Sequence, residues 1–133
     1  MKGQYDLSTV GGQYLLTNAG AAPIDAPGGS IANTIAARGI KVKIYVSGAP
    51  GGTSPTMTVT IQGVDVPSGQ KWTLLASVAI NSAGLTILTV YPGAAVTANV
   101  SANDELPSNF NVHVAFGGTT PTFNGDISIE LLP

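Results

Sequence analysis

The chain contains no cysteine, so disulfide bonds, thiol catalysis and cysteine-ligated metal sites are excluded. Charge is also scarce, because charged residues make up 9% of the chain, whereas soluble proteins commonly carry about 25%. The formal net charge is −2, and neither sign dominates, which argues against nucleic acid or an anionic membrane as the partner. A surface this neutral favours coverage by neighbouring protein; the alternative is a free monomer that its Thr and Asn side chains keep in solution.

Long apolar runs are absent as well. No run approaches the roughly 20 residues needed to span a bilayer. Residues 1–6 lack the apolar core of a signal peptide, so we expect synthesis and use, or assembly, in a cytoplasm. The 133 residues fit one domain, since single domains commonly run about 100–200 residues. A chain of this length buries roughly two-thirds of its unfolded surface and can build a core without cross-links.

What the sequence does contain is a series of runs in which apolar and polar residues alternate. Successive side chains of a strand point to opposite faces of a sheet, so each run predicts one core face and one outer face. The outer positions are mostly small or hydroxylated. The predicted core positions are Ile40, Val42, Ile44 and Val46; Met57, Val59 and Ile61; Phe110, Val112, Val114 and Phe116; and Phe123, Ile127, Ile129 and Leu131.

Glycine and proline separate these runs. The pattern predicts strands at 38–47, 56–64, 71–80, 85–91, 110–116 and 123–132. Between them we expect a loop at 48–55, turns at 65–69 and 117–121, a tight hairpin turn at 81–84 and a break at 104–108. Residues 94–103 are a short strand or a loop, and 31–37 are a strand rather than a two-turn helix. The expected fold is an all-β antiparallel sandwich, jelly-roll-like, over residues 31–133.

Residues 1–30 differ from the remainder because Gly and Pro interrupt them repeatedly. We expect an extended N-terminal arm with one or two short strands, which either docks on its own domain or reaches a neighbouring subunit. Its longest apolar patch, Tyr14, Leu15 and Leu16, is a candidate contact with a partner.

The residues that carry chemistry are dispersed. The only histidine, His113, lies in mid-strand on the face opposite Phe110 and Phe116, where an imidazole at an outer face or interface is expected. Asp104 and Glu105 form the only adjacent acidic pair, without the spaced acidic loop of a calcium site. The glycine clusters lack the residues that follow a phosphate-binding loop. We therefore predict no catalytic residues, no metal and no cofactor.

Two further groups are candidate contacts. Arg38, Lys41 and Lys43 are the only basic concentration, suited to an acidic protein surface or simply solvated. Trp72 and Tyr91 could act as stacking platforms for a carbohydrate, although a single Trp in a β-sandwich often lies half in the core.

Several of these segments follow one another in a characteristic order along the chain: Arg38-Gly39-Ile40, Thr58-Val59-Thr60-Ile61-Gln62-Gly63, Trp72-Thr73-Leu74-Leu75-Ala76-Ser77, Leu88-Thr89-Val90-Tyr91-Pro92-Gly93 and Leu106-Pro107. In this order residues 39–133 resemble small virion structural proteins of tailed bacteriophages and prophages, specifically head decoration or cement proteins. The resemblance implies a non-enzymatic protein on the capsid exterior, assembled in the bacterial host cytoplasm. Its implied partners are the major capsid protein and itself, as a homotrimer. The alternative is a carbohydrate- or cell-surface-binding module of a phage fibre or tail.

Overall fold

The computed structural model describes residues 11–19 and 22–133, with the backbone alone for 11–19 and for Pro27. Strands dominate, with one short 3-10 turn, and the described part contains no helix long and apolar enough to cross a membrane. The elements are β1 (Gly11–Ala19), η1 (Pro27–Gly29), β2 (Ile31–Ala32), β3 (Gly39–Val46), β4 (Gly51–Asp65), β5 (Gln70–Ala76), β6 (Gly84–Val90), β7 (Ser101–Ala102) and β8 (Asn109–Leu132).

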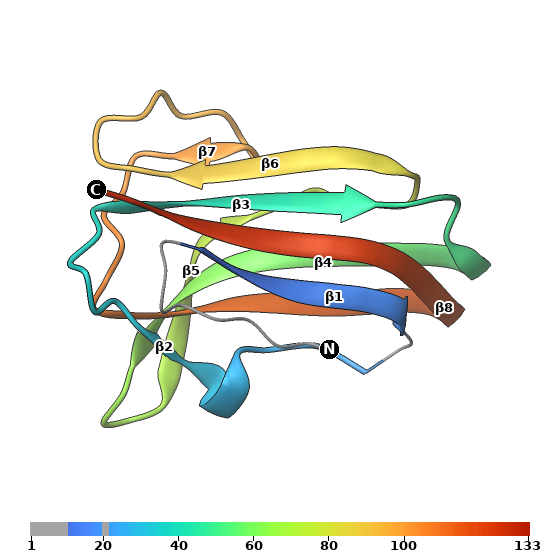
Figure 1. Cartoon of the computed structure of the whole chain (residues 1–133), viewed down its shortest axis with the longest axis horizontal. Helices are drawn as coiled ribbons and strands as arrows, with labels where there is room; N and C mark the ends of the chain where they lie inside the picture. The colour runs from blue at the N-terminus through green and yellow to red at the C-terminus, as the bar shows by residue number, and fades with distance from the viewer. Residues whose placement is uncertain (1–10, 20–21) are drawn as a thin grey trace.

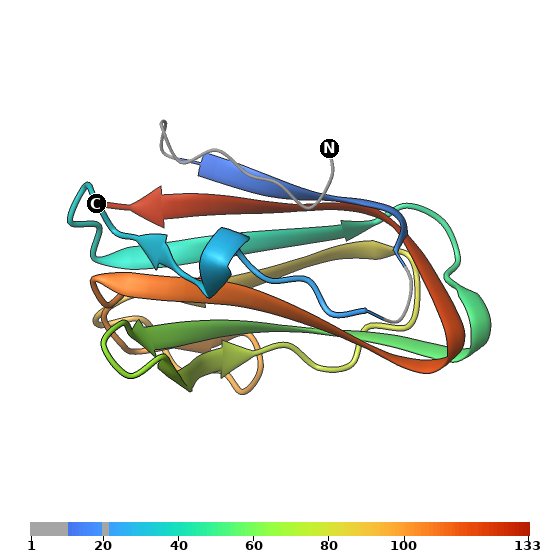
Figure 2. The same ribbon diagram turned by 90° about the horizontal axis from the view of Figure 1, so that it is seen from below.

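The strands form two layers that share the long strand β8 (Figures 1 and 2). The C-terminal half of β8 lies between β1 and β3, and β3 continues to β6 and β7. The N-terminal half lies between β2 and β4, and β4 continues to β5. Every strand pair is antiparallel except β6 with β7. The predicted fold class, an all-β antiparallel sandwich of jelly-roll type, is confirmed.

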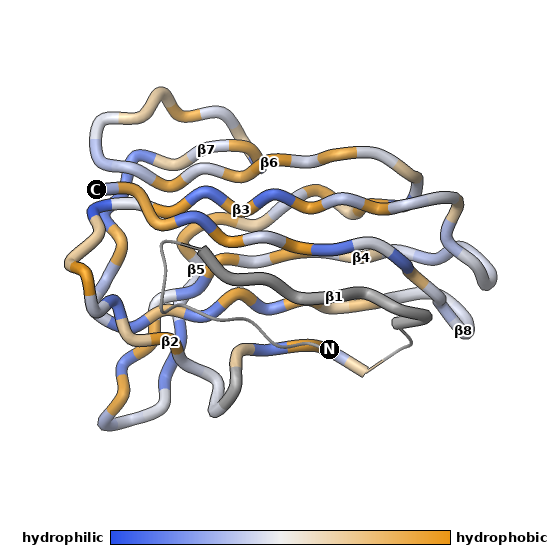
Figure 3. The backbone as a smooth tube through the Cα atoms, viewed as in Figure 1, coloured by the Kyte–Doolittle hydropathy of each residue, from blue (hydrophilic) through white to orange (hydrophobic). Residues whose placement is uncertain are grey.

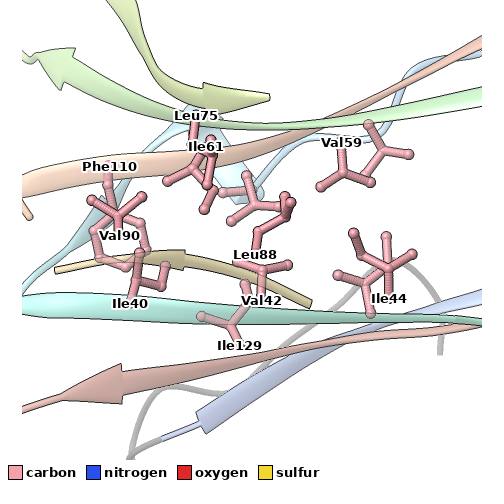
Figure 4. Close-up of a cluster of buried hydrophobic side chains, with 14 of the residues drawn as sticks. Ile40, Val42, Ile44, Val59, Ile61, Leu75, Leu88, Val90, Phe110 and Ile129 are labelled. Carbon is pink, nitrogen blue, oxygen red and sulfur yellow. The ribbon is translucent and has the colours of Figure 1, made fainter. Parts of the chain in front are cut away.

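The core lies between the two layers and is made from the alternating apolar positions. Figure 3 shows the alternation of hydropathy along the strands, and Figure 4 shows buried side chains from both layers pointing toward one another. All predicted core positions are buried except Phe116, which is half-buried against the cluster. Full burial of each such side chain contributes about 1.5–3 kcal/mol. The core adds Leu75 from β5 and Leu88 and Val90 from β6.

The hairpin predicted at 81–84 is wrong. Strand β5 pairs with β4, whereas β6 pairs with β3 in the other layer. Residues 77–83 therefore cross from one layer to the other, fastened at Ile80 by an isolated bridge to Met57 of β4. A short Gly-containing segment predicts a change of direction, but it does not say which strand the chain will pair with next.

The loop at 48–55 and the turn at 117–121 are also wrong in part. Strand β4 begins at Gly51, and β8 runs without a break through the expected turn, so that Gly51 pairs with Thr122 and Thr53 with Thr119. Gly52 and Gly118 have φ of 100° and 92°, which side chains other than glycine rarely adopt. The two Gly-rich segments thus bend together and carry β8 from one layer into the other (Figure 2).

The strand expected at 31–37 is limited to β2. Beyond it the Asn33 side chain accepts a hydrogen bond from the Ala37 N–H (2.8 Å) and donates one to the Ala37 carbonyl (2.9 Å), which holds a tight turn. The turn at 65–69 and the break at 104–108 are confirmed, and 94–103 contains both a loop and the short strand β7.

Residues assigned to the N-terminal arm lie along β8. Gly11–Leu16 pair with the C-terminal half of β8, and Ile24 bridges to Val114 in its N-terminal half. Residues 1–10 lie outside the described part of the chain. The division into an arm of 1–30 and a domain of 31–133 remains a prediction.

Candidate functional site

Five of the eight predicted contact residues have described side chains, and these five do not form one site. Tyr14, Leu15 and Leu16 have a described backbone in β1, paired with β8, but their side chains lie outside the description. The other five fall into three places, which are a corner with Arg38 and Tyr91, the outer face of β3 with Lys41 and Lys43, and the surface of β5 with Trp72.

At the corner, Tyr91 fastens the chain rather than presenting a free ring. Its hydroxyl donates a hydrogen bond to the main-chain oxygen of Pro133 (2.8 Å), and its ring lies against Gly39, where any side chain would collide with it. The Arg38 guanidinium carbon lies 5.4 Å from the centre of the ring, within the range of a cation–π contact. Arg38 and Tyr91 are therefore engaged with each other at the surface.

Lys41 and Lys43 point outward from β3, together with Tyr45. The Nζ of Lys43 lies 3.2 Å from a carboxylate oxygen of Glu130 on β8, and Glu130 is also the cross-strand partner of Lys41. Because both partners of the ion pair are 43% exposed, it contributes about 0–1 kcal/mol to stability. This arrangement separates the expected basic concentration, since Arg38 contacts Tyr91 and Lys43 is neutralised by Glu130.

The same surface carries three exposed apolar side chains that the sequence analysis did not single out. Tyr45 is paired with Leu85 of β6 across the sheet, and Lys43 is paired with Ile87. Tyr45, Leu85 and Ile87 are 46%, 62% and 41% exposed. We call this surface, with Lys41 and Lys43, the β3–β6 face.

Trp72 lies over the glycine of a neighbouring strand. It is paired with Gly63 of β4, and a side chain at Gly63 would overlap the Trp72 indole ring. The ring is 47% exposed and does not belong to the buried cluster. Of the two alternatives left open by the sequence, the geometry is closer to a half-open aromatic platform on the surface of β5.

A polar cluster joins the chain before β2 to the outer side of β8. The carboxylate of Asp25 accepts a hydrogen bond from the Asn111 amide (2.7 Å) and lies 2.7 Å from Nδ1 of His113. Asn111 is fully buried, and it also accepts from the Ala26 N–H and donates to Gln62. The cluster therefore satisfies a buried amide and holds residues 25–26 against the sheet.

Burial alone would raise the pKa of Asp25, but hydrogen bonds from Asn111 and His113, followed by the charges of His113 and Lys71, lower it below its ordinary value. Because an ionised carboxylate only accepts hydrogen bonds, Nδ1 of His113 is the atom that donates the proton in its contact with Asp25. His113 is thus at the outer side of the sheet, as expected, and engaged with a carboxylate. Among the described residues, no group of three or more His, Asp or Glu side chains could hold a metal ion.

One open groove lies away from all the predicted contacts. It has a volume of about 350 Å³ and is lined by residues 78–86, which connect β5 to β6 and begin β6. Val78 at one end is 60% exposed and Leu85 at the other is 62% exposed. The groove therefore borders the β3–β6 face.

Comparison with known proteins adds little to this geometry. No protein-family model and no curated protein matches the chain. Among solved structures, the chain is similar to PirA, with 12% identity, coverage of 95% of this chain and 96% of that chain, and a TM-score of 0.49. It is also similar to the CBM22-1–GH10 modules of Clostridium thermocellum xylanase 10B with xylohexaose (11% identity, 100% and 24% coverage, TM-score 0.42). A third likeness is to infectious bursal disease virus Gt strain (11% identity, 97% and 29% coverage, TM-score 0.35). With TM-scores below 0.5, these likenesses carry no functional assignment.

Proposed function

We propose that this chain is a non-enzymatic structural protein of a phage particle, a decoration protein that binds the outside of the head lattice and stabilises it. Its partners in this role are the major capsid protein and further copies of itself, and it joins the capsid exterior in the bacterial host cytoplasm. The observation that carries the proposal is the β3–β6 face, where Tyr45, Leu85 and Ile87 are exposed on a sheet stiffened by a packed core. Exposed apolar side chains gathered on a rigid sheet, beside the ion pair of Lys43 and Glu130, suit burial against another protein.

The test is to add the purified chain to undecorated capsids and measure bound protein and the temperature at which the capsids open. We expect stoichiometric binding and a higher opening temperature. Tyr45→Asp should weaken binding, because it replaces an exposed apolar ring of the β3–β6 face by a carboxylate across the sheet from Asp126. Val66→Asp is the matched control, since Val66 is 56% exposed in the turn between β4 and β5. Absence of binding by the unaltered chain would reject the decoration role.

A second candidate function, a carbohydrate-binding module of a phage fibre or tail, is favoured by the Trp72 platform. A half-exposed indole lying over Gly63 offers a flat ring face, on which a sugar ring can stack. Affinity electrophoresis or a glycan array would show binding that Trp72→Ala abolishes and Tyr45→Ala leaves unchanged. If no glycan binds the unaltered chain, this second function is rejected.

A further inference from the structure

One flank of the sandwich carries no charge. Between Lys71 and Asp104 the sequence contains no Asp, Glu, Lys, Arg or His. This stretch forms β5, β6, β7 and their connections, and Figure 1 shows β6, β7 and the loop between them along the upper edge. Six of the nine large hydrophobic side chains exposed in the described part belong to it: Trp72, Val78, Leu85, Ile87, Val96 and Val100. We call β6, β7 and the connections at 77–83 and 91–100 the uncharged flank.

Strand β6 has an open edge within this flank. One edge pairs with β3 along its whole length, whereas β7 covers the other edge only at Thr89 and Val90. The Thr89 N–H donates outward to the Val100 carbonyl (3.0 Å). Because backbone groups alternate along a strand, the N–H and C=O groups of Leu85 and Ile87 point to the same outer side. Among the described residues, no strand pairs with them there.

This edge lacks the features that keep the edge strands of monomers apart. Natural edges are protected by charged side chains, proline, a bulge or a covering segment. Gly84–Val90 contains no charge and no proline, and its pairing with β3 has no register shift. The open groove lined by residues 78–86 lies directly beside it, so an uncharged hollow of mixed polar and apolar lining adjoins the edge.

We propose that β6 pairs with β6 of a second copy, antiparallel about a twofold axis, so that the sheets of the two copies become one. This inference deepens the proposed function, on which the need for self-association rests, by naming the surface that copies share. A second copy fits because it brings an equally uncharged flank and the same unpaired groups. With Thr86 on the axis, Leu85 of each copy lies opposite Ile87 of the other. The outward N–H and C=O groups of Leu85 and Ile87, four in each copy, then all form hydrogen bonds between the copies.

The side chains favour the same register. Leu85 and Ile87 are exposed on the outer face, so directly opposed residues would pack beside each other on that face. The exposed Val78, Val96 and Val100 of the uncharged flank lie in the connections beside the edge. A standard interface buries about 800 Å² per partner, roughly one-eighth of the accessible surface of 6394 Å². A trimer, as implied by the family resemblance, would require β6 to meet a different strand.

The first experiment is sedimentation of the full chain at micromolar concentration, without capsids. We expect a mass about twice 13.3 kDa. Leu85→Lys combined with Ile87→Lys should give a monomer that keeps the far-ultraviolet spectrum of a β protein, whereas Val66→Lys should stay dimeric. A monomeric or trimeric parent chain would overturn the proposal, as would a double variant that remains a dimer.

The second experiment tests the register and does not depend on lysine substitutions. In the proposed pairing, Thr86 faces its own copy across the axis at a non-hydrogen-bonded position, where Cα atoms lie about 4.5 Å apart and a disulfide can form. Because the chain has no cysteine, Thr86→Cys introduces a single thiol. We expect rapid disulfide-linked dimers under mild oxidation, and slow cross-linking for Thr73→Cys on the exposed surface of β5. Equal rates for the two variants would overturn this register.

Failure of this inference and failure of the proposed function are distinguishable. A parent chain that is monomeric yet binds and stabilises capsids overturns the β6 pairing and leaves the decoration role standing. A dimer with the expected cross-link that ignores capsids supports the pairing and rejects the decoration role.

Discussion

At the scale of single residues, Gly63 is the position that admits the Trp72 ring. Gly63→Ala should lower the free energy of unfolding by about 1–3 kcal/mol, because the added methyl group overlaps the indole and forces it to move. Gly51→Ala in the same strand is the control, since its added carbon would lie 3.5 Å from Thr122, an ordinary contact. Urea unfolding followed by the emission of Trp72, the only tryptophan, measures both stability and ring environment. Equal stabilities of the two variants would contradict this account.

Asp25 predicts an acid dependence of stability. Its pKa is lower in the folded chain than the ordinary 3.8, so its stabilising contribution is present above 3.8 and is lost as the pH falls through the folded value. At neutral pH, the free energy of unfolding of Asp25→Asn should be lower than that of the unaltered chain by about 1–3 kcal/mol. The difference between the two proteins should narrow as the pH falls through the folded pKa of Asp25. Denaturant unfolding across this pH range measures it, with Asp104→Asn, in an exposed loop, as the control. A difference that stays constant with pH would contradict the assignment.

At the scale of elements, Gly125 is the point where β8 enters the layer containing β3. It has a φ of 141° and is paired with Val46, and a side chain there would overlap the Tyr45 carbonyl oxygen. Gly125→Ala should therefore cost more than about 3 kcal/mol of unfolding free energy, since backbone cannot yield as a side chain can. Gly93→Ala tests positive φ alone, because Gly93 has a φ of 88° in open space, and it should cost about 1–2 kcal/mol. Thermal unfolding of the two variants compares these costs.

The elements also show how far a single sequence leads. Alternation located β3 and most of β4 and predicted which of their faces is buried, because a period of two is a local property of the chain. Pairing is not local, so nothing in residues 81–84 indicated that β6 would join β3 instead of β5. The Gly-rich stretches at 51–55 and 117–121 look like loops separately, and they become strand only because each is the partner of the other.

The contact residues were predictable in part for a similar reason. Lys41, Lys43 and Trp72 are at the surface because their strands alternate, but their dispersal depends on strand order. Leu85 and Ile87 were missed because the run around them is apolar on both faces, which conceals the outer positions. The signal that could have found them is the absence of charge from Lys71 to Asp104.

At the scale of the whole molecule, charge is segregated. Lys43 and Glu130 form an ion pair on the β3–β6 face, Asp25 contacts His113 beside β8, and the uncharged flank contains no charged residue. Both of these contacts join strands or segments within one copy. An association through the flank therefore depends on backbone hydrogen bonds and apolar contact instead of ion pairs.

That segregation predicts how the dimer responds to salt. Screening weakens contacts between exposed charges, so an interface without charge should change its dissociation constant by less than about threefold between about 50 mM and about 500 mM sodium chloride. Sulfate should tighten it, because excluded salts strengthen apolar burial. Sedimentation equilibrium in the three buffers measures both effects. A dissociation constant that rises steeply with sodium chloride would contradict an uncharged interface, and would instead indicate that Lys41, Lys43 and Glu130 on the β3–β6 face join the copies.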